Sequence, residues 1–372
     1  MKILVSGGHF SPAHSVIREL ISQKNSVLIA GRKSSFEGEK SDSYEYIVAK
    51  KEKIPFFEIR AGRLQRYVNK FAFVSFLKLF LGIYDGIVII RRFKPDVVLT
   101  FGGYISFPVG VGAFLMRVPL VIHEQTQKAG LANRLLGQIA TRICITFPSS
   151  FKYFPRGKIV LTGNPVRKEI FDVKKPFDVP MDKKIIYITG GSAGSHFINL
   201  LVLQIIPRLL QKYTVIHQVG DSQEFKDYEV LKAKKDTLPK ELRDRYILEK
   251  FILPESIGWV FQNTTLVVSR SGVNTVIELI LLGKPAFLIP LPHGQSNEQL
   301  DNAKLLKSIG IGEYSHQGTL TGKLLYESID NMTKNIKNYL KIINFSKGYL
   351  KKDATKNITE VLVDVYEKKK KK

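Results

Sequence analysis

The chain has 372 residues, of which 44% are hydrophobic, so it can form two domains of ordinary size, each with its own core. Lys and Arg outnumber Asp and Glu by 57 to 33, and this net charge of +24 favours anionic partners such as nucleotide phosphates, anionic lipid or nucleic acid. Cys144 is the one cysteine, which excludes a disulfide within the chain, and no Cys/His cluster suggests zinc.

The first half of the chain alternates short apolar runs with amphipathic segments. Strands are predicted at 1–5, 26–30, 96–100, 119–122, 140–147 and 158–162. Helices are predicted at 13–23 and 107–115. Strands that alternate with helices indicate a parallel sheet covered by helices, which is an α/β fold.

The apolar segment 71–90 is about as long as a membrane span. Lys78 and Asp85 interrupt it, and each would cost about 2.5–3.5 kcal/mol near the centre of a spanning helix, so we reject a transmembrane span. Two alternatives remain open: a helix packed in the core, or a helix lying in a membrane interface. Basic and aromatic residues favour contact with anionic lipid, namely Arg63, Arg66, Lys70, Phe73, Phe76 and Phe80.

A segment rich in proline and mixed charges, 164–183, predicts a linker between two domains, 1–163 and 184–344. After it the alternation restarts. Strands are predicted at 184–189, 214–219, 265–269 and 285–290, and helices at 197–211, 274–282 and 299–309. We expect a C-terminal helix at about 345–367 to pack back on the first domain, and the lysine run 368–372 to be disordered.

Glycine-rich turns follow several predicted strands, at Gly7-Gly8, Gly102-Gly103, Gly190-Gly191 and Gly272. Ligands of doubly wound sheets bind beyond the carboxyl ends of the strands. Glycines let backbone N–H groups approach an anion, and the start of a helix adds positive partial charge. Ser192 can donate its hydroxyl to a phosphate oxygen. The alternative is a tight turn without a ligand, because neither GxxxxGK[ST] nor GxGxxG occurs.

The segment from Ser269 to Glu278 carries a more specific pattern. Asn274 or Thr275 can cap a helix and leave its first N–H groups free for a diphosphate. Glu278 lies one turn beyond Asn274, where its carboxylate can accept from both hydroxyls of a ribose. An ordinary first-turn glutamate, favoured by the helix dipole, is the alternative. Farther on, Gln299 offers a polar side chain suited to sugar hydroxyls, or to a helix cap.

Two residues are candidate general bases. His9 follows Gly7-Gly8 in a turn, where a histidine can take a proton near neutral pH, and Glu124 lies at the end of the predicted strand 119–122. A structural role is the alternative for each. No DxD motif occurs, so nothing in the sequence requires a metal to hold a diphosphate.

Taken in order, these segments resemble the MurG family of N-acetylglucosamine transferases, in glycosyltransferase family 28. The matching motifs are Gly7-Gly8-His9, Phe101-Gly102-Gly103-Tyr104, His123-Glu124-Gln125, Gly163-Asn164-Pro165-Val166-Arg167, Gly190-Gly191-Ser192, Ser269-Arg270-Ser271-Gly272 and Gln299-x-x-Asn302. The resemblance implies a GT-B fold, in which two Rossmann-like domains face each other across a cleft. It also implies an inverting transfer of GlcNAc from UDP-GlcNAc to undecaprenyl-diphosphate-linked MurNAc-pentapeptide, with no cofactor and no metal.

The resemblance also assigns site residues. Arg167 and Ile252 would lie near the uridine, Glu278 would hold the ribose, and Gln299 would bind the GlcNAc hydroxyls. The diphosphate region would be contacted by Ser192, Val273, Asn274, Thr275, Val276 and Ile277. The reacting sugar and the acceptor would meet Gly7, Gly8, Tyr104 and Thr126, with His9 as the base and Glu124 as the second candidate. The basic and aromatic residues around 63–81 would hold the protein, as a peripheral enzyme, at the cytoplasmic face of the cell membrane.

Three positions depart from the family pattern. The first loop is Ser6-Gly7-Gly8-His9 instead of the longer GGTGGH form, Thr126 replaces an asparagine, and Glu298 stands where His or Gln is usual. These departures leave open a related lipid-directed glycosyltransferase with another acceptor. A UDP-GlcNAc 2-epimerase of the same fold is a weaker alternative, as is a basic nucleic-acid-binding protein, for which no recognition motif appears.

Overall fold

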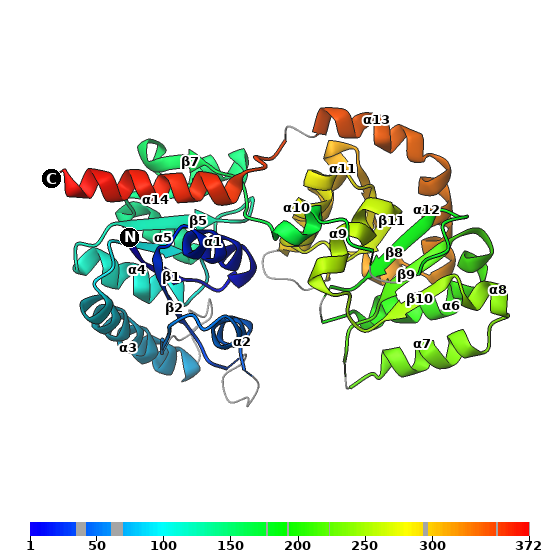
Figure 1. Ribbon diagram of the computed structural model, residues 1–372, viewed down its shortest axis with the longest axis horizontal. Coiled ribbons are helices and arrows are strands. Elements are labelled where there is room, and N and C mark those ends of the chain that lie inside the picture. The colour runs from blue at the N-terminus through cyan, green and yellow to red at the C-terminus, as the bar shows by residue number, and fades with distance from the viewer. Residues whose placement is uncertain are drawn as a thin grey trace. The chain divides into compact units, whose positions relative to one another are not determined.

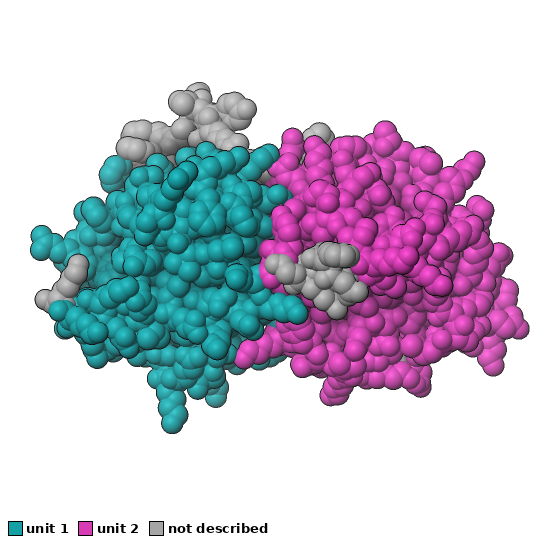
Figure 2. Space-filling view, turned by 90° about the horizontal axis from the view of Figure 1, so that it is seen from above, with its two compact units in different colours: residues 1–167, 351–372 teal, residues 168–350 magenta. Residues whose placement is uncertain are grey.

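The computed structural model describes residues 1–34, 42–60, 70–175, 178–191, 193–222, 224–292, 297–346 and 349–371, with the backbone alone at 70–77 and 343–346. The chain forms two compact units (Figure 2). Unit 1 contains residues 1–167 and 351–372, and unit 2 contains residues 168–350. The chain therefore passes from unit 1 into unit 2 after Arg167 and returns to unit 1 after Leu350.

Unit 1 is built on a parallel sheet of seven strands in the order β3-β2-β1-β4-β5-β6-β7 (Figure 1). The strands are β1 (Lys2–Ser6), β2 (Ser26–Gly31), β3 (Phe56–Glu58), β4 (Val97–Thr100), β5 (Leu120–Glu124), β6 (Arg142–Ile145) and β7 (Ile159–Leu161). The six strands predicted in this half are confirmed, and β3 was missed. Most strand residues are buried, as expected for a parallel sheet covered on both faces.

Helices cover both faces of this sheet. They are α1 (Phe10–Ser22), α2 (Tyr44–Lys51), α3 (Lys70–Phe93), α4 (Ser106–Leu115), α5 (Leu131–Ile139) and α14 (Ala354–Lys370). One core joins α1 and α14 to the sheet through residues such as Ile17, Leu99 and Leu362. The other joins α3, α4 and α5 to it through Ile90, Val109 and Leu136. The last helix of the chain thus completes the core of the first unit, beside α1 (Figure 1).

The helix α3 packs closely on α4. A Cβ at Gly86 would lie 3.3 Å from the Cα of Val109, so the glycine allows the two backbones to approach.

Asp85 of α3 is buried and accepts from Arg60 through both carboxylate oxygens, with the Nη2 donor at 2.6 Å and the Nε donor at 2.9 Å. Within the described residues, no helix is both long and apolar enough to span a bilayer.

Unit 2 is built on a second parallel sheet, of six strands in the order β10-β9-β8-β11-β12-β13. The strands are β8 (Ile185–Thr189), β9 (Thr214–Gln218), β10 (Tyr246–Glu249), β11 (Thr264–Ser269), β12 (Ala286–Leu288) and β13 (Gly312–Tyr314). The helices are α6 (His196–Lys212), α7 (Asp227–Asp236), α8 (Lys240–Arg243), α9 (Pro254–Asn263), α10 (Val273–Leu282), α11 (Glu298–Ile309), α12 (Gly322–Lys334) and α13 (Ile336–Ser346). The four strands predicted here are confirmed, whereas β10 and β13 were missed.

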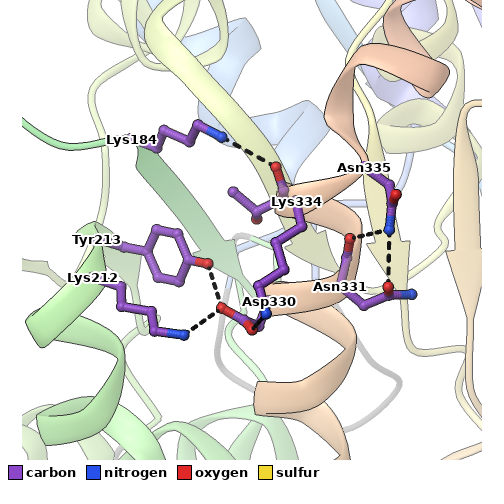
Figure 3. A network of polar contacts seen from close by, with 8 residues as sticks. Lys184, Lys212, Tyr213, Asp330, Asn331, Lys334 and Asn335 are labelled. Atoms are coloured by element: carbon purple, nitrogen blue, oxygen red, sulfur yellow. Dashed lines mark hydrogen bonds and ion pairs between the residues drawn. The ribbon is translucent and has the colours of Figure 1, made fainter.

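A polar network fixes α12 against the end of α6 (Figure 3). Asp330 accepts from Lys212 Nζ at 2.8 Å and from the Tyr213 hydroxyl at 3.0 Å, and it pairs with Lys334 Nζ at 2.8 Å. These donors hold the pKa of the Asp330 carboxyl well below its usual range, chiefly through the Lys212 hydrogen bond. Burial raises the pKa of Tyr213 to about 12, and the bond to Asp330 adds to this rise.

The predicted disorder of the lysine run is wrong for Lys368–Lys370, which form the last turn of α14. Lys368 pairs with Asp364 one turn earlier at 2.7 Å, and the Lys370 ammonium lies 4.6 Å from the centroid of the Tyr366 ring. Side-chain pairs at this spacing stabilise a helix, so the like charges of the run do not prevent it.

Candidate active site

In unit 1 the glycine turns that follow β1 and β4 lie against each other. The N–H of Gly8 donates to the carbonyl of Gly102 at 2.8 Å, and a Cβ on Gly103 would lie 3.0 Å from the Cα of Gly8. A Cβ on Gly7 would lie 2.8 Å from the backbone nitrogen of Phe101. The structure thus brings the two predicted turns together at the carboxyl edge of the sheet, where ligands of such folds bind.

Glu124 ends β5 at the same edge, and its side chain is only 4% exposed. One carboxylate oxygen lies 2.9 Å from the Thr126 N–H and 2.7 Å from its hydroxyl. The other accepts from the Gly130 N–H at 3.1 Å and from Asn133 Nδ2 at 3.0 Å. The carboxylate therefore connects the loop after β5 to the start of α5, and Thr126 is one of the residues that donate hydrogen bonds to it.

Burial lowers the pKa of His123 to about 4. A smaller contribution in the same direction comes from the neighbouring His9. His123 is therefore neutral at physiological pH, and its Nε2–H donates to the Gly163 carbonyl at 3.0 Å. Its Nδ1 is buried without a hydrogen-bond partner among the described residues. His9 is exposed at the N-cap of α1, and its side chain does not cap that helix. The geometry leaves His9 accessible to a substrate.

Tyr104, the remaining predicted residue of this edge, is half-buried and lies under the guanidinium of Arg32, 5.0 Å from the ring centroid. Arg167 is the last residue of the first of the two segments that make up unit 1. Asn133 lies in the segment Gly130-Leu131-x-Asn133, which also matches the family pattern, but it was assigned no role from the sequence; its amide bridges Glu124 and the His123 carbonyl.

In unit 2 the turn after β8 leads into α6. A Cβ on Gly190 or Gly194 would overlap backbone atoms, of Ser195 and Val219 respectively, so these two glycines are required by packing alone. Gly191 has φ +88° and open space beside it. Ser192, predicted to contact a phosphate, lies outside the described residues.

The side chain of Gln218, at the end of β9, connects three parts of this edge. Its Nε2 donates to the Gly191 carbonyl at 3.1 Å. Its Oε1 accepts from the Tyr187 hydroxyl at 3.2 Å and from the Ile252 N–H at 3.4 Å. The structure thereby joins the glycine turn to Ile252, the residue predicted near the uridine, through a glutamine that the sequence did not single out.

The helix α10 begins at Val273, with Gly272 as N-cap and no side-chain cap. The prediction that Asn274 or Thr275 caps the helix is wrong, because the helix starts before both and they occupy its first turn. Val276 and Ile277 are buried within the helix. Glu278 follows in the second turn and is 6% exposed. The uncapped start carries N–H groups and positive partial charge suited to an anion.

The helix α11 is tied to the same edge. Gln299 Oε1 accepts from the Leu291 N–H at 3.1 Å, and Asn302 Nδ2 donates to the Ser271 carbonyl at 3.1 Å. Asn302 is buried, so it positions the turn before α10. The hydroxyl of Ser271 is fully buried and has no hydrogen-bond partner among the described residues.

A connected set of mostly buried polar side chains packs against the start of α6. His196 pairs with Asp227 at 2.7 Å, and Asn199 Nδ2 donates to the second oxygen of Asp227 at 2.8 Å. The Asn199 carbonyl accepts from His217 Nε2 at 3.1 Å, and Nδ1 of that ring lies 2.9 Å from the Tyr246 hydroxyl. Burial lowers the pKa of His217 to about 3 and raises that of Tyr246. The neutral side chains of His217 and Tyr246, through Asn199 and Asp227, therefore fix the start of α6. They thereby also fix the glycine turn that precedes it.

Throughout the described part of the chain, no three His, Cys, Asp or Glu side chains gather where they could share a metal ion.

Two family models match the chain, and together they include both units. The glycosyltransferase family 28 N-terminal domain matches residues 6–145, and the glycosyltransferase family 28 C-terminal domain matches residues 185–358. The first contains the turns of Gly7 and Gly102, and the second contains those of Gly191 and Gly272.

Relatives with the same name match over nearly the whole length. The UDP-N-acetylglucosamine–N-acetylmuramyl-(pentapeptide) pyrophosphoryl-undecaprenol N-acetylglucosamine transferase of Clostridium tetani is 31% identical over 99% of this chain and 98% of its own. Its namesake from Clostridium botulinum (strain Langeland) is 32% identical over 97% and 98%.

Solved structures show the same fold. Acinetobacter baumannii MurG superimposes with a TM-score of 0.73 at 24% identity, over 98% of this chain and 99% of its own. A UDP-GlcNAc 2-epimerase from Neisseria meningitidis bound to UDP-GlcNAc gives 0.64 at 16% identity, over 98% and 100%. The predicted GT-B fold class is confirmed. The chain belongs to glycosyltransferase family 28 and, within it, to the MurG family of UDP-N-acetylglucosamine–N-acetylmuramyl-(pentapeptide) pyrophosphoryl-undecaprenol N-acetylglucosamine transferases.

Proposed function

We propose that this chain transfers GlcNAc from UDP-GlcNAc to undecaprenyl-diphosphate-linked MurNAc-pentapeptide, with inversion at the anomeric carbon. The observation that carries the proposal is the full-length identity of 31% to a transferase named for this reaction. The uncapped start of α10 at the carboxyl edge of unit 2 supports it, because such a helix end stabilises a nucleoside diphosphate.

The donor is held by unit 2 in this proposal. The first turn of α10, from Val273 to Ile277, borders the diphosphate, and Ser192 adds a hydroxyl. The N–H groups of Val273, Asn274 and Thr275 donate to it, because the Val276 N–H already donates to the Gly272 carbonyl at 3.0 Å. Glu278 accepts from the ribose hydroxyls, Ile252 borders the uracil, and Gln299 contacts the sugar. As the bond to the sugar breaks, negative charge develops on the departing UDP, and the helix start stabilises this charge where it forms.

The acceptor is met by unit 1. His9 removes the proton of the attacking hydroxyl, because it is exposed next to Gly7 and Gly8 and its side chain caps nothing. Glu124 was the second candidate base. Its two oxygens already accept four hydrogen bonds within the protein, which favours a positioning role for Glu124 over proton transfer. Tyr104 and Thr126 border the acceptor, Thr126 through the loop that Glu124 holds.

We also propose that α3 lies against the cytoplasmic face of the cell membrane as part of a peripheral site. Arg63 and Arg66 lie outside the described residues, and the side chains of Lys70, Phe73 and Phe76 are not described. Phe80 and Tyr84, on the same helix, are 55% and 61% exposed. Exposed aromatic residues beside basic ones suit an anionic bilayer surface.

The reaction is tested with the purified protein, UDP-GlcNAc and the lipid-linked muramyl acceptor. We expect UDP release that requires both substrates, and a glycosylated lipid with inverted configuration. Turnover with another sugar nucleotide but not with UDP-GlcNAc would refute the donor, and conversion of UDP-GlcNAc without acceptor to its 2-epimer would indicate the epimerase instead. His9→Ala should lower kcat while UDP affinity is unchanged.

The membrane proposal is tested by sedimentation with vesicles that contain or lack anionic lipid. We expect binding to the anionic vesicles and a loss of at least about fivefold in Phe80→Ser combined with Tyr84→Ser, since two exposed aromatic side chains leave the interface. Phe171→Ser, at an equally exposed aromatic residue of unit 2, is the matched control and should bind as the wild type does. Equal binding by the double variant would exclude this face of α3.

A further inference from the structure

Gln218 carries a buried amide at the end of β9, the strand between β8 and β10 in the sheet of unit 2. It is the register partner of Thr189 on one side and of Glu249 on the other. Its side chain therefore lies at the carboxyl edge, between the turn after β8 and the loop after β10. It reaches the turn through the 3.1 Å bond to the Gly191 carbonyl, and the loop through the 3.4 Å bond from the Ile252 N–H.

These two partners require a side chain that both donates and accepts. The Gly191 carbonyl can only accept and the Ile252 N–H can only donate, so the amide has one orientation in which both bonds form. The Tyr187 hydroxyl donates to the same oxygen at 3.2 Å, and its ring packs edge-to-face on that of Phe261 with centroids 5.7 Å apart. A carboxylate at position 218 would supply no donor, and an aliphatic side chain would supply neither group.

The sheet itself does not require a polar side chain at this position. β9 is paired on both sides, and its neighbouring residues Ile216 and Val219 are apolar and buried. Burying an amide is unfavourable unless its groups form hydrogen bonds. Two of the three bonds of Gln218 go to segments that follow the neighbouring strands, so its effect is on the edge of the sheet.

The two segments that Gln218 connects have little apolar packing of their own. Phe251 and Leu253, in the loop after β10, are 50% and 60% exposed. Gly191 has no side chain and open space at its Cβ position. Its carbonyl also accepts from the Gly194 N–H at 3.1 Å, within the same turn. The bond from Gln218 adds a contact that reaches across to the loop after β10.

We propose that Gln218 is a positioning residue for the donor nucleotide, which holds the loop at Ile252 and the turn at Gly191 in one fixed arrangement. In the proposed function the loop borders the uracil, and the turn leads to Ser192 beside the diphosphate. A ligand that contacts both segments needs their backbones at a fixed spacing, and ordering them before the ligand arrives lowers the entropy cost of binding. The inference rests on the proposed function of unit 2 as the donor site.

Gln218→Met tests the proposal, because it keeps the length of the side chain and removes its hydrogen bonds. We expect KM for UDP-GlcNAc to rise at least about tenfold while kcat at saturating donor stays within about threefold, since binding is lost without loss of transition-state stabilisation. Affinities for UDP and for uridine, measured by titration, should each fall at least about fivefold. Gln218→Glu returns an acceptor to the Ile252 N–H, so its affinity for uridine should recover to within about twofold of the wild type.

Tyr213→Phe is the matched control. Tyr213 is also buried and directly precedes β9, and the variant removes its hydrogen bond to Asp330 at the opposite edge of the sheet. We expect KM for UDP-GlcNAc to be unchanged in this variant.

The outcomes separate a positioning role from a structural one. A lower kcat with unchanged KM in Gln218→Met would show that the amide only stabilises the fold, because a smaller folded fraction reduces the amount of active enzyme and not its affinity. That result, unchanged kinetics, or no recovery of uridine binding in Gln218→Glu would overturn the inference and leave the donor site intact. If Gln218→Met does not fold, Gln218→Asn, whose amide is one methylene short, gives the same comparison. Wild-type protein that binds neither UDP nor uridine would instead refute the proposed function, and the inference with it.

Discussion

Replacing Glu124 by glutamine tests whether its carboxylate organises the loop after β5. Each carboxylate oxygen accepts two hydrogen bonds, from Thr126 on one side and from Gly130 and Asn133 on the other. A glutamine must direct its NH2 group at one of these donor pairs. If the NH2 group faces Thr126, the Thr126 hydroxyl can accept from it, but the Thr126 N–H loses its acceptor. If the NH2 group faces the other side, the Gly130 N–H and the Asn133 amide both lose their acceptor.

The magnitude follows from the number of donors left without a partner. One or two buried donors lose their acceptor, at about 1–3 kcal/mol each, and the others lose a charged acceptor, so we expect destabilisation of about 2–4 kcal/mol. In a domain of this size that lowers the melting temperature by roughly 5–12 °C. Calorimetry of the full chain measures it. Glu58→Gln is the control, because Glu58 is half-exposed and its ion pair among the described residues is with Lys33 at 3.2 Å, so its melting temperature should shift by less than about 2 °C.

The two roles of Glu124 predict opposite results. If Glu124 were the general base, Glu124→Gln would melt as the wild type does and lose turnover alone. An unchanged melting temperature would therefore refute the reasoning from the four hydrogen bonds.

Three further predictions follow. Glu278→Gln should weaken UDP binding at least about tenfold, because hydrogen bonds to a charged acceptor contribute about 1.5–3 kcal/mol, but 2′,3′-dideoxy-UDP should bind both forms equally; a loss for both ligands would refute the ribose role. Asp330→Asn should cost about 1 kcal/mol at pH 7, an amount limited by the solvent-exposed lysines. The pKa of Asp330 is depressed in the folded state, so this stability is present above the unfolded pKa of about 4 and is lost progressively as pH falls from there through the lower folded pKa; a difference in urea midpoint that is as large at pH 2 as at pH 7 would contradict it. Gly194→Ala should destabilise more than Gly191→Ala by about 1–3 kcal/mol in urea unfolding, since both have positive φ but only the first Cβ meets the Val219 carbonyl; equal costs would contradict the packing argument.

The sequence predicted the central strands of both sheets and missed three at the edges. β3, β10 and β13 each end a sheet and have three or four residues. An edge strand pairs on one side only, so its sequence carries a weaker apolar pattern than a strand buried on both sides. The central strands, such as β4 and β8, are continuous apolar runs that end in glycine turns, and this made them predictable.

In the site, local features were predictable and long-range ones were not. The glycine turns were found because a strand, glycines and a helix follow one another in sequence. Gln218 contacts Gly191, 27 residues away, so nothing near it in sequence signals its role. Asn302 lay in a recognised motif, but its contact with Ser271, 31 residues away, could not be read from the motif. Arg270 also lay within a recognised motif, but its contacts with the carbonyls of Ile289 and Pro290 depend on the fold.

The return of the chain to unit 1 has a consequence for its biosynthesis. Ile358, Leu362 and Val365 of α14 belong to the same core as Val5 and Phe10, near the other end of the chain. While the ribosome is still making unit 2, the nascent N-terminal sheet lacks this helix, and apolar residues on one of its faces stay uncovered. The first unit to be synthesised is therefore the last to complete its core, and a message truncated before codon 354 would yield a protein with an intact unit 2 and an unfinished unit 1.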